Sequence, residues 1–516
     1  MNIGFASVYS FRPHVEHLSY VADLLRAGGQ KPFFLTCDAQ FSMCYARALR
    51  HTSAVTECPK CIIGGIRSFQ PGDVDTFSVR DSACLPDDRA RNMVASSALT
   101  LVRTETRAEI ERRDVQEAIA ALAPAAARAY ASTRAWIERR NLQAIVVFNG
   151  RMDATRAMTE AAADLGVPFV TMERTWFSDG LQLTPNANCL DLRHLKRLNQ
   201  DFSDKPLTER QARRAARYLA SRQLRRNTNE WRAYNKKVIP LRWPASGAGA
   251  RVLILPGSRN EVEGHPDWEH GWSDFGQALD AVFEKLALDV GSAVIRCHPN
   301  WGQKIGVRTG ELSEDFYTRW AQDRGVYCIS SRQSASTNDL IDQAELVIVT
   351  GGSSAFEAGA LGKPVISLGP ATYLGASCCF FATGLDMLET LSNVWSTPSD
   401  RIARQTLHYG YTHLCRMPQY FDYVKAVTPT RYRYFPGADP ERLMRMIATG
   451  QLEADDATFA IDTSGEDRIL AAIAERDWET LLAFQDETPQ GSLKVQRRPA
   501  LRWIDAAREL LPRGDT

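Results

Sequence analysis

Short apolar runs alternate with segments of helical spacing along most of the chain. The strand-like runs cover residues 2–8, 31–37, 144–149 and 168–172, and then 251–257, 292–299, 326–330, 345–351 and 364–369. Short apolar strands that alternate with helices are typical of parallel, doubly wound sheets. The pattern therefore predicts an α/β protein with two Rossmann-like halves that face a central cleft.

The break between the two series falls at "PASGAGA", residues 244–250, which have small side chains and no hydrophobic pattern. We therefore expect a first domain over 1–243, a second domain over 251–450 and a C-terminal tail over 451–516. Apolar residues in the tail recur at helical spacing, so the tail should be helical.

One long helical segment is expected inside the first domain. Residues 104–141 are rich in Ala, Arg and Glu and keep helical spacing. Proline lacks the backbone N–H that a helix interior needs, so we expect the helix to break at Pro124.

Composition and charge narrow the class of protein. The chain has 516 residues, more than one ordinary core holds, which agrees with two domains. Its net charge is +1 and its basic residues are dispersed, so nucleic acid is not an expected partner. The chain begins without a secretory pattern and has no apolar run near the roughly 20 residues of a membrane helix. We therefore expect a soluble, cytoplasmic protein.

Ligands of doubly wound sheets bind outside the carboxyl ends of the strands, so the residues after the strands are the candidates for binding. Gly352, Ser353 and Ser354 follow the run at 345–351 and should begin a helix whose N-terminus favours a phosphate. Glu357 lies one turn further and could accept hydrogen bonds from a ribose diol. The alternative is a helix cap, because a Ser followed three residues later by Glu fits a capping box.

Two further strand ends of the second domain carry polar side chains. Arg296, His298 and Asn300 lie at the end of the run that begins at 292, and Ser258, Arg259 and Glu261 follow the run that begins at 251. Arg296 or His298 could contact a phosphate. Because three strand ends of one sheet are polar, a nucleotide site explains them better than three separate caps.

These segments resemble a known family. "IRCHPN" and "ELVIVTGGSSAFEAGALGKPVISLGPATY" are similar to the bacterial capsule polysaccharide biosynthesis glycosyltransferases, which include the Kdo-transferring capsule enzymes and have the GT-B fold. The His-Pro and Ser-Ser elements also resemble the pair that binds CMP in several bacterial sialyltransferases. The resemblance covers residues 251–375. It implies that a CMP-, UDP- or GDP-sugar binds between His298 and the Ser353–Glu357 turn.

The resemblance also implies the partners. The acceptor would be a capsule, O-antigen or related cell-surface glycan, free or linked to a lipid. The enzyme could then work in association with the inner face of the cytoplasmic membrane. No redox cofactor is expected.

The strand ends of the first domain supply the candidate catalytic residues. Asn149 and Arg151 follow one strand and Glu173 follows the next, so Arg151 and Glu173 should converge on the cleft unless they form a salt bridge at its rim. The "FNGR" and "ER" segments also resemble glycosyltransferases of surface polysaccharides, in which they face the donor domain. His14 lies in the first loop after a strand and is a candidate general base, or simply a polar residue near a helix start. Asp153 is a further carboxylate candidate.

Four cysteines cluster near the N-terminus. Cys37, Cys44, Cys58 and Cys61 have the spacing C-x6-C-x13-C-x2-C. Four thiolates satisfy the tetrahedral coordination of Zn²⁺, so we expect a structural zinc site. The alternatives are reduced core thiols and an iron–sulfur cluster.

Two other functions stay open. The "GG…EA…LGKPV" pattern is also similar to non-hydrolysing UDP-GlcNAc 2-epimerases, which share the fold, although their other charged residues have no evident counterpart in the first domain. A non-catalytic protein that binds sugar nucleotides is the third possibility.

Overall fold

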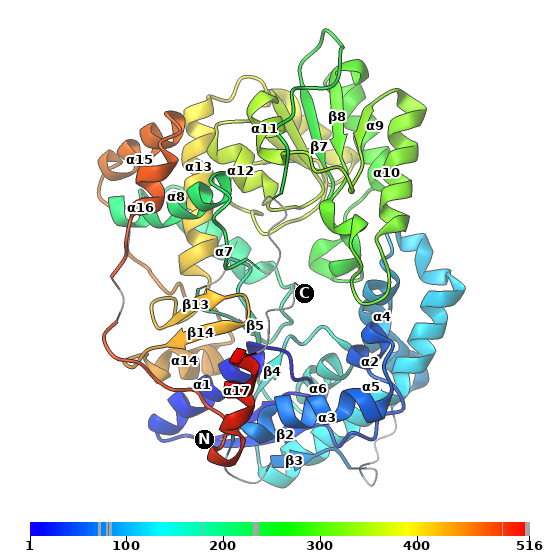
Figure 1. Cartoon of the computed structure of the whole chain (residues 1–516), viewed down its shortest axis with the longest axis vertical. Coiled ribbons are helices and arrows are strands. Elements are labelled where there is room, and N and C mark those ends of the chain that lie inside the picture. Colours follow the sequence, from blue (N-terminus) through cyan, green and yellow to red (C-terminus); the bar gives the residue numbers. More distant parts are fainter. Residues whose placement is uncertain are drawn as a thin grey trace.

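Two six-stranded sheets, one above the other in Figure 1, organise the chain. The computed structural model describes residues 1–70, 74–78, 81, 85–177, 179–230, 237–487 and 489–510. Both sheets are mainly parallel and covered by helices, so the prediction of two doubly wound α/β halves is confirmed. Within the described residues, every helix is too short or too polar to cross a lipid bilayer.

The first sheet has the strand order β3-β2-β1-β4-β5-β6. Its strands are β1 (Asn2–Ala6), β2 (Lys31–Thr36), β3 (Val74–Thr76), β4 (Ala144–Phe148), β5 (Phe169–Arg174) and β6 (Leu181–Pro185). Strand β4 is "AIVVF" with every residue buried, as expected for a parallel strand covered on both faces. β6 pairs antiparallel with β5 and forms one edge.

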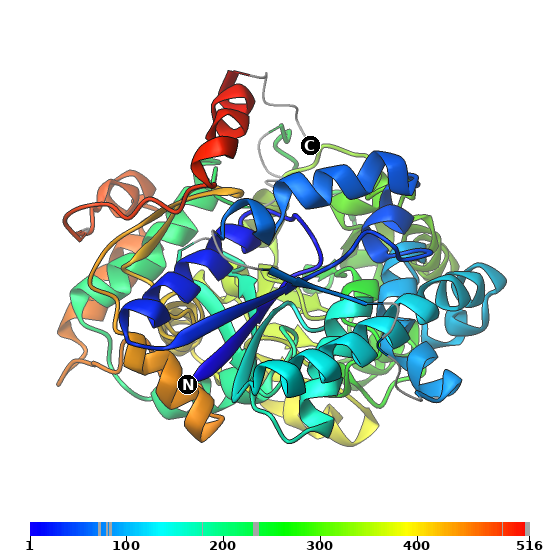
Figure 2. The ribbon, with the colours of Figure 1, turned by 90° about the horizontal axis from the view of Figure 1, so that it is seen from below.

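Helices cover both faces of the first sheet (Figure 2). They are α1 (His14–Ala27), α2 (Tyr45–Arg50), α3 (Ala54–Gly64), α4 (Asp87–Val102), α5 (Arg113–Arg140) and α6 (Asp153–Asp164). Trp136 of α5 packs directly on β1, where a Cβ at Gly4 would lie 2.4 Å from its ring.

The predicted helix break at Pro124 is wrong. α5 runs for 28 residues and holds Pro124 in its interior. Proline removes one backbone hydrogen bond, but the small buried residues Ala123, Ala125 and Ala126 around it belong to the core of the first sheet. Tertiary packing over a long helix outweighs one lost bond.

The second sheet has the order β12-β11-β10-β7-β8-β9, and its recorded pairs are parallel. Its strands are β7 (Val252–Leu255), β8 (Ala293–Arg296), β9 (Tyr327–Ile329), β10 (Leu346–Val349), β11 (Val365–Ser367) and β12 (Phe380–Phe381). Its helices include α9 (Phe275–Lys285), α10 (Glu311–Arg324), α11 (Thr337–Gln343), α12 (Ser354–Ala360) and α13 (Ser399–Tyr411).

The chain passes between the two halves more than once, as Figure 1 shows. The remaining elements are α7 (Arg193–Phe202), α8 (Glu209–Gln223), β13 (Val424–Thr428), β14 (Arg431–Tyr434), α14 (Pro440–Thr449), α15 (Ser464–Ala474), α16 (Trp478–Ala483) and α17 (Arg502–Leu510). Apolar residues of α8, α15 and α16 share a core with the second sheet, whereas those of β13, β14 and α14 share the core of the first. The domain boundaries at 243 and 451 stay a prediction. The hydrophobic cores do not follow them, because α8 lies before residue 243 but packs with the second sheet, and β13, β14 and α14 lie before residue 451 but pack with the first.

The C-terminal end of α4 holds the halves together through hydrogen bonds. Arg103 donates to the backbone oxygens of Asn300 (3.0 Å) and Gln303 (2.8 Å) in the second half. Glu105, which is buried, accepts hydrogen bonds from Ser313 Oγ (2.6 Å) and Tyr317 Oη (2.9 Å) of α10. Two hydroxyl donors from α10 therefore meet one carboxyl group of the first half.

Glu105 should make the stability of the protein depend on pH. Burial raises its pKa from 4.5 to about 8 against the opposing hydrogen bonds from Ser313 and Tyr317. A carboxyl with a raised folded-state pKa destabilises the fold when it ionises, so stability is greatest below the unfolded value and falls as pH rises toward 8, by on the order of 5 kcal/mol. We expect Glu105→Gln to flatten this slope in thermal unfolding, with the exposed Glu117→Gln as control. An unchanged slope in Glu105→Gln would show that Glu105 is not the titrating group.

Candidate functional site

A cavity lies at the carboxyl ends of β7, β8 and β10 and has a volume of about 150 Å³. Six of the predicted donor-binding residues line it: Arg296, His298, Gly352, Ser353, Ser354 and Glu357. The segment at and after the end of α8 supplies Arg222, Arg225, Asn227 and Glu230. These four polar residues were not predicted, because they lie far from the strand ends in sequence and α8 reads as a charged surface helix.

Arg222 is the centre of the polar contacts in this cavity. Its guanidinium donates to both carboxylate oxygens of Glu230, at 2.8 and 2.9 Å. It also donates to Glu357 and lies 3.4 Å from Ser353 Oγ. Burial raises the pKa of Glu357, and the charge of Arg222 opposes that shift.

The helix-cap alternative for Glu357 fails in this structure. Ser354, the serine three residues before Glu357, is the first residue of α12 and not its N-cap. The N-cap residue is Ser353, whose side chain makes no capping bond, and the Glu357 carboxylate accepts from Arg222 instead. α12 has only seven residues, so its dipole is a minor source of positive potential. The arginines of the cavity, rather than the helix end, would therefore attract an anion.

His298 lines the cavity as a neutral donor. Burial lowers its pKa to about 4, so the imidazole is uncharged at neutral pH. Its Nδ1 accepts a hydrogen bond from the backbone N–H of Asn300 at 3.2 Å, which places the ring proton on Nε2. His298 can donate a hydrogen bond to a phosphate or ribose oxygen but cannot supply a positive charge.

Arg296 has mainly a structural role. Its terminal nitrogens donate to the backbone oxygens of Cys297 (2.7 Å), Ser330 (2.9 Å) and Gln333 (2.9 Å). These bonds join the ends of β8 and β9 and leave the Arg296 Nε buried without a hydrogen bond. Because the guanidinium is occupied by carbonyl groups, it is a poor candidate for the phosphate contact that the sequence suggested.

The residues from Ser258 onward lie against the first half of the chain, whereas Pro256 and Gly257, directly after β7, line the cavity. Ser258 Oγ donates to Asn300 Oδ1 at 3.0 Å, and that same oxygen lies 3.3 Å from Arg103. Arg259 pairs with Glu263 at 2.5 Å, and the η3 turn of Arg259–Glu261 packs on α4. The structure therefore separates Ser258, Arg259, Glu261 and Asn300 from the residues that line the cavity.

Three of the four predicted catalytic residues meet in the first half. Glu173, at the end of β5, contacts His14 Nε2 and accepts from Asn149 Nδ2 at 2.8 Å. Burial alone would raise the pKa of Glu173, but the charge of His14 and hydrogen bonds from His14 and Asn149 lower it to about 2. A carboxylate with such a pKa is a weak base, so it orients His14 rather than taking a proton itself. His14 Nδ1 is buried without a hydrogen bond.

The turn after β4 explains the position of Asn149. Asn149 and Gly150 have φ values of 63° and 71°, in the left-handed region that Asn and Gly adopt at least cost. A Cβ at Gly150 would lie 2.4 Å from Thr171 Cγ2, so this turn requires glycine. Asn149 Oδ1 accepts from the backbone N–H of Arg151 (3.0 Å) and that of Met152 (3.2 Å), which leaves its Nδ2 for Glu173.

Arg151 and Asp153 turn away from this group. Arg151 Nη1 donates to Ser96 Oγ and Thr100 Oγ1 of α4, both at 2.9 Å. Asp153 is fully buried, contacts the Tyr9 hydroxyl and accepts from the backbone N–H of Tyr45 at 2.9 Å. Both residues thus stabilise the packing around α6 in this structure.

The loop after β5 connects the two sites. Phe177 lies four residues beyond Glu173, and Arg222 stacks on its ring with 5.9 Å to the centroid. The same ring lies 5.0 Å from that of His413 and 4.6 Å from that of Tyr218. The segment that follows the Glu173 site therefore reaches the arginine of the cavity in the second half.

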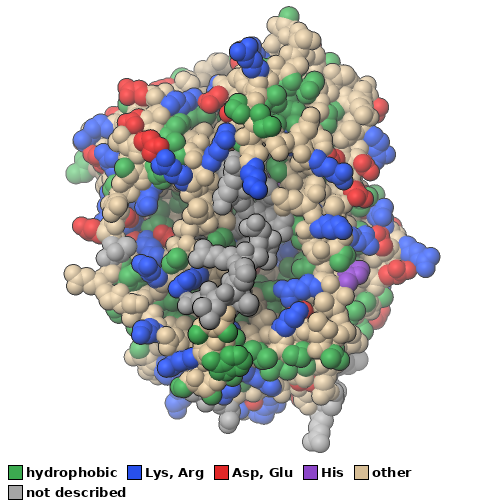
Figure 3. All heavy atoms as spheres, viewed as in Figure 1, with side chains coloured by type: hydrophobic (Ala, Val, Ile, Leu, Met, Phe, Trp, Pro, Cys, Tyr) green, Lys and Arg blue, Asp and Glu red, His purple; other side chains and the backbone are tan. Residues whose placement is uncertain are grey.

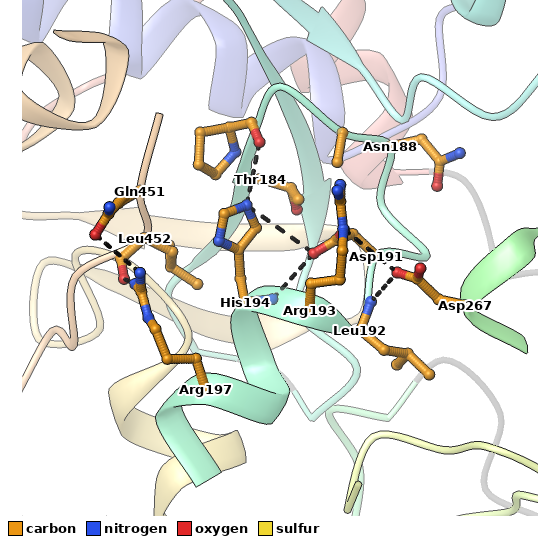
Figure 4. A network of polar contacts seen from close by, with 12 residues as sticks. Thr184, Asn188, Asp191, Leu192, Arg193, His194, Arg197, Asp267, Gln451 and Leu452 are labelled. Atoms are coloured by element: carbon orange, nitrogen blue, oxygen red, sulfur yellow. Dashed lines mark hydrogen bonds and ion pairs between the residues drawn. The ribbon is translucent and has the colours of Figure 1, made fainter. Parts of the chain in front are cut away.

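A network of hydrogen bonds and ion pairs connects the loop after β6 to the second half (Figure 4). The buried Asp191 carboxylate accepts from Arg193 Nε (2.6 Å) and from the backbone N–H of His194 (3.1 Å). The backbone N–H of Leu192 donates to Asp267 of the second half at 2.9 Å. This loop therefore fixes the antiparallel edge of the first sheet against the second half.

The four clustered cysteines line one small cavity of about 30 Å³ between β2 and α3. Burial raises the pKa of Cys37 and of Cys44 to about 12, so both are thiols at neutral pH. Across the described part of the chain, no three His, Cys, Asp or Glu side chains group closely enough to hold a metal ion. Zinc at Cys37, Cys44, Cys58 and Cys61 stays a prediction, to be decided by metal analysis of the purified protein.

Comparisons with known proteins leave the function open. No family model matches the chain, and no curated protein matches it. One similar solved structure is KpsC of Thermosulfurimonas dismutans, a beta Kdo 2,4 transferase, with 15% identity over 64% of this chain and 87% of that chain and a TM-score of 0.34. Another is the UDP-GlcNAc 2-epimerase of Methanocaldococcus jannaschii, with 10% identity, coverage of 87% and 100%, and a TM-score of 0.30. The spinosyn rhamnosyltransferase SpnG has 14% identity, coverage of 80% and 95%, and a TM-score of 0.27. Likenesses of this size carry no argument about function.

Proposed function

We propose that this protein is a glycosyltransferase that moves a sugar from a nucleotide-activated donor to a glycan acceptor. The observation that carries the proposal is the cavity at the carboxyl ends of the second sheet. It is lined by three arginines against two glutamates, with the hydroxyls of Ser353 and Ser354 and the neutral imidazole of His298 beside them. Cations suit a phosphate, and uncharged donors and a carboxylate suit a ribose.

Arg225 is the best candidate for the phosphate contact. It lines the cavity, is exposed, and donates to the backbone oxygen of Val238 at 3.3 Å. Arg222 is already paired with Glu230 and Glu357, so its role would be to hold the Glu357 carboxylate in place. Arg222 would thereby act as a positioning residue for the ribose contact.

The group around Glu173 would serve the transfer step. Glu173 accepts a hydrogen bond from His14 Nε2, so the lone pair of the neutral ring is on Nδ1, which can take a proton from an acceptor hydroxyl. Because His14 Nδ1 is buried, the acceptor would have to open this site on binding. By the family resemblance, the acceptor would be a cell-surface glycan or its lipid-linked precursor, met at the inner face of the cytoplasmic membrane.

Thermal unfolding with a panel of CMP-, UDP- and GDP-sugars tests the donor. A ligand that binds only the folded state stabilises it by about 2.7 kcal/mol at 100 times Kd. We expect the sugar nucleotides of one base to raise the melting temperature of the protein. The matching donor should be consumed only when a glycan acceptor is present. Failure of all three bases to bind would contradict the proposal. Conversion of the donor sugar without an acceptor would indicate an epimerase, and binding without turnover a non-catalytic protein.

A further inference from the structure

Helix α3 exposes an apolar face to solvent. Val55, Ile62 and Ile63 are 86%, 41% and 47% exposed, and Pro59 is also exposed. Their spacing of i, i+4, i+7 and i+8 places them on one side of the helix. The buried side chain of α3 is instead the charged Glu57, which pairs with Arg50. A helix whose apolar stripe faces outward has a surface that the fold does not use.

The C-terminal segment adds a second apolar group beside it. Trp503 of α17 is 66% exposed. The segment is fastened next to the end of α3: Arg497 donates to the backbone oxygen of Ile63, and the Arg498 backbone N–H donates to that of Ser68 at 2.7 Å. α3 and α17 lie near one another on the same face in Figures 1 and 2, and Figure 3 shows apolar side chains gathered along the lower part of that face. Val55, Pro59, Ile62, Ile63 and Trp503 are called the α3–α17 surface below.

The charge around this surface is positive. Residues 493–504, "LKVQRRPALRWI", contain four cations and no carboxylate. Lys60 of α3 keeps 58% of its side chain exposed. The nearby carboxylates are already paired: Glu57 with Arg50 and with Lys60 (3.5 Å), and Asp505 with Arg12 (2.6 Å) and with the buried Arg497 (3.0 Å). Lys494, Arg498 and Arg502 are exposed in addition to these pairs. The exposed excess charge is therefore cationic.

We propose that the α3–α17 surface binds an anionic lipid bilayer, with its apolar side chains in the interfacial region and Lys60, Arg498 and Arg502 at the headgroups. Amphipathic helices with a bulky apolar face and flanking Lys and Arg bind membranes in this way, and Trp prefers the headgroup level. A protein partner is the weaker reading, because the flanking charge has one sign and a lipid surface supplies its complement without a specific shape. The inference does not rest on the proposed function.

Co-sedimentation of the full-length protein with vesicles tests this proposal. We expect binding to vesicles of phosphatidylcholine with phosphatidylglycerol, weak binding to phosphatidylcholine alone, and weakening of the first by salt. The variant Val55→Ser/Ile62→Ser/Ile63→Ser/Trp503→Ser should bind at least about tenfold more weakly. Lys60→Glu/Arg502→Glu should lose the preference for phosphatidylglycerol. The control Leu385→Ser/Trp395→Ser removes apolar residues that are 63% and 49% exposed in the second half and should bind as the wild type does.

A fluorescence measurement tests the same proposal with a single substitution that should not disturb the fold. Tryptophan fluorescence should be quenched by brominated lipid in the wild type and less so in Trp503→Phe, whose melting temperature should be unchanged. Wild-type protein that ignores phosphatidylglycerol vesicles, or a four-residue variant that binds as well as wild type, would overturn the proposal. So would a concentration-dependent dimer that the four-residue variant abolishes, because the surface would then belong to a second copy of the chain.

Discussion

Glu173→Gln should slow sugar transfer by roughly 100-fold or more and change nucleotide affinity little. The Glu173 carboxylate accepts the hydrogen bond of His14 Nε2 and so keeps the lone pair on Nδ1. A glutamine amide can instead donate to Nε2, which moves the ring proton to Nδ1 and removes the base. Loss of an interaction that acts only in the transition state appears in kcat and not in binding.

Transfer assays and isothermal titration with the same donor measure this split. Glu160→Gln is the matched control, because Glu160 pairs with Arg89 on the surface of α6 in the same half at 2.9 Å. His14→Ala should reproduce the loss in kcat. Near-normal transfer in both Glu173→Gln and His14→Ala would mean that the catalytic residues lie elsewhere, and the donor site would then have to be judged on nucleotide binding alone.

Arg222→Leu should destabilise the protein by roughly 3–5 kcal/mol, because it leaves the carboxylates of Glu357 and Glu230 without their cation in a largely buried site. Denaturant unfolding measures this loss. Arg226→Leu, one turn along and paired with the exposed Glu479 at 2.8 Å, should cost much less.

A compensated variant separates stability from binding. Arg222→Leu combined with Glu230→Gln and Glu357→Gln removes the unpaired charges, so most of the stability should return. Nucleotide affinity should stay low, since the ribose contact at Glu357 loses its charge, which is worth about 1.5–3 kcal/mol. Recovery of full affinity in this triple variant would exclude Glu357 as a nucleotide ligand.

Hydrophobic periodicity along the chain was sufficient to predict both sheets. Each strand that the pattern predicted is present, because a buried parallel strand needs an uninterrupted apolar run such as "AIVVF" or "LVIV". The strands it missed, β3, β6, β12 and the β13–β14 hairpin, lie at sheet edges or outside both sheets. β3 and β12 are two or three residues long and half-buried, and β6, "LQLTP", is buried but contains Gln and Thr, so none of them has a long uninterrupted apolar run.

Strand-end reasoning located part of each site for the same physical reason. Parallel strands bring their carboxyl ends to one edge, which is why His298, Ser353 and Glu357 line one cavity and why Asn149 meets Glu173. The position of a strand end predicts where the backbone of a residue lies, but it does not predict the direction of the side chain. Arg296 turned to backbone carbonyls and Arg151 to α4, since each found buried acceptors nearer than the cavity.

Tertiary packing decided the features that depend on residues distant in sequence. His14 reaches Glu173 across 159 positions and Arg222 reaches Glu357 across 135, and no local pattern encodes either pair. The uninterrupted α5 likewise depends on packing that outweighs the local cost of Pro124. Local periodicity expresses which face of an element is buried. Which partner this face or a charged side chain contacts depends on the tertiary packing of the whole chain.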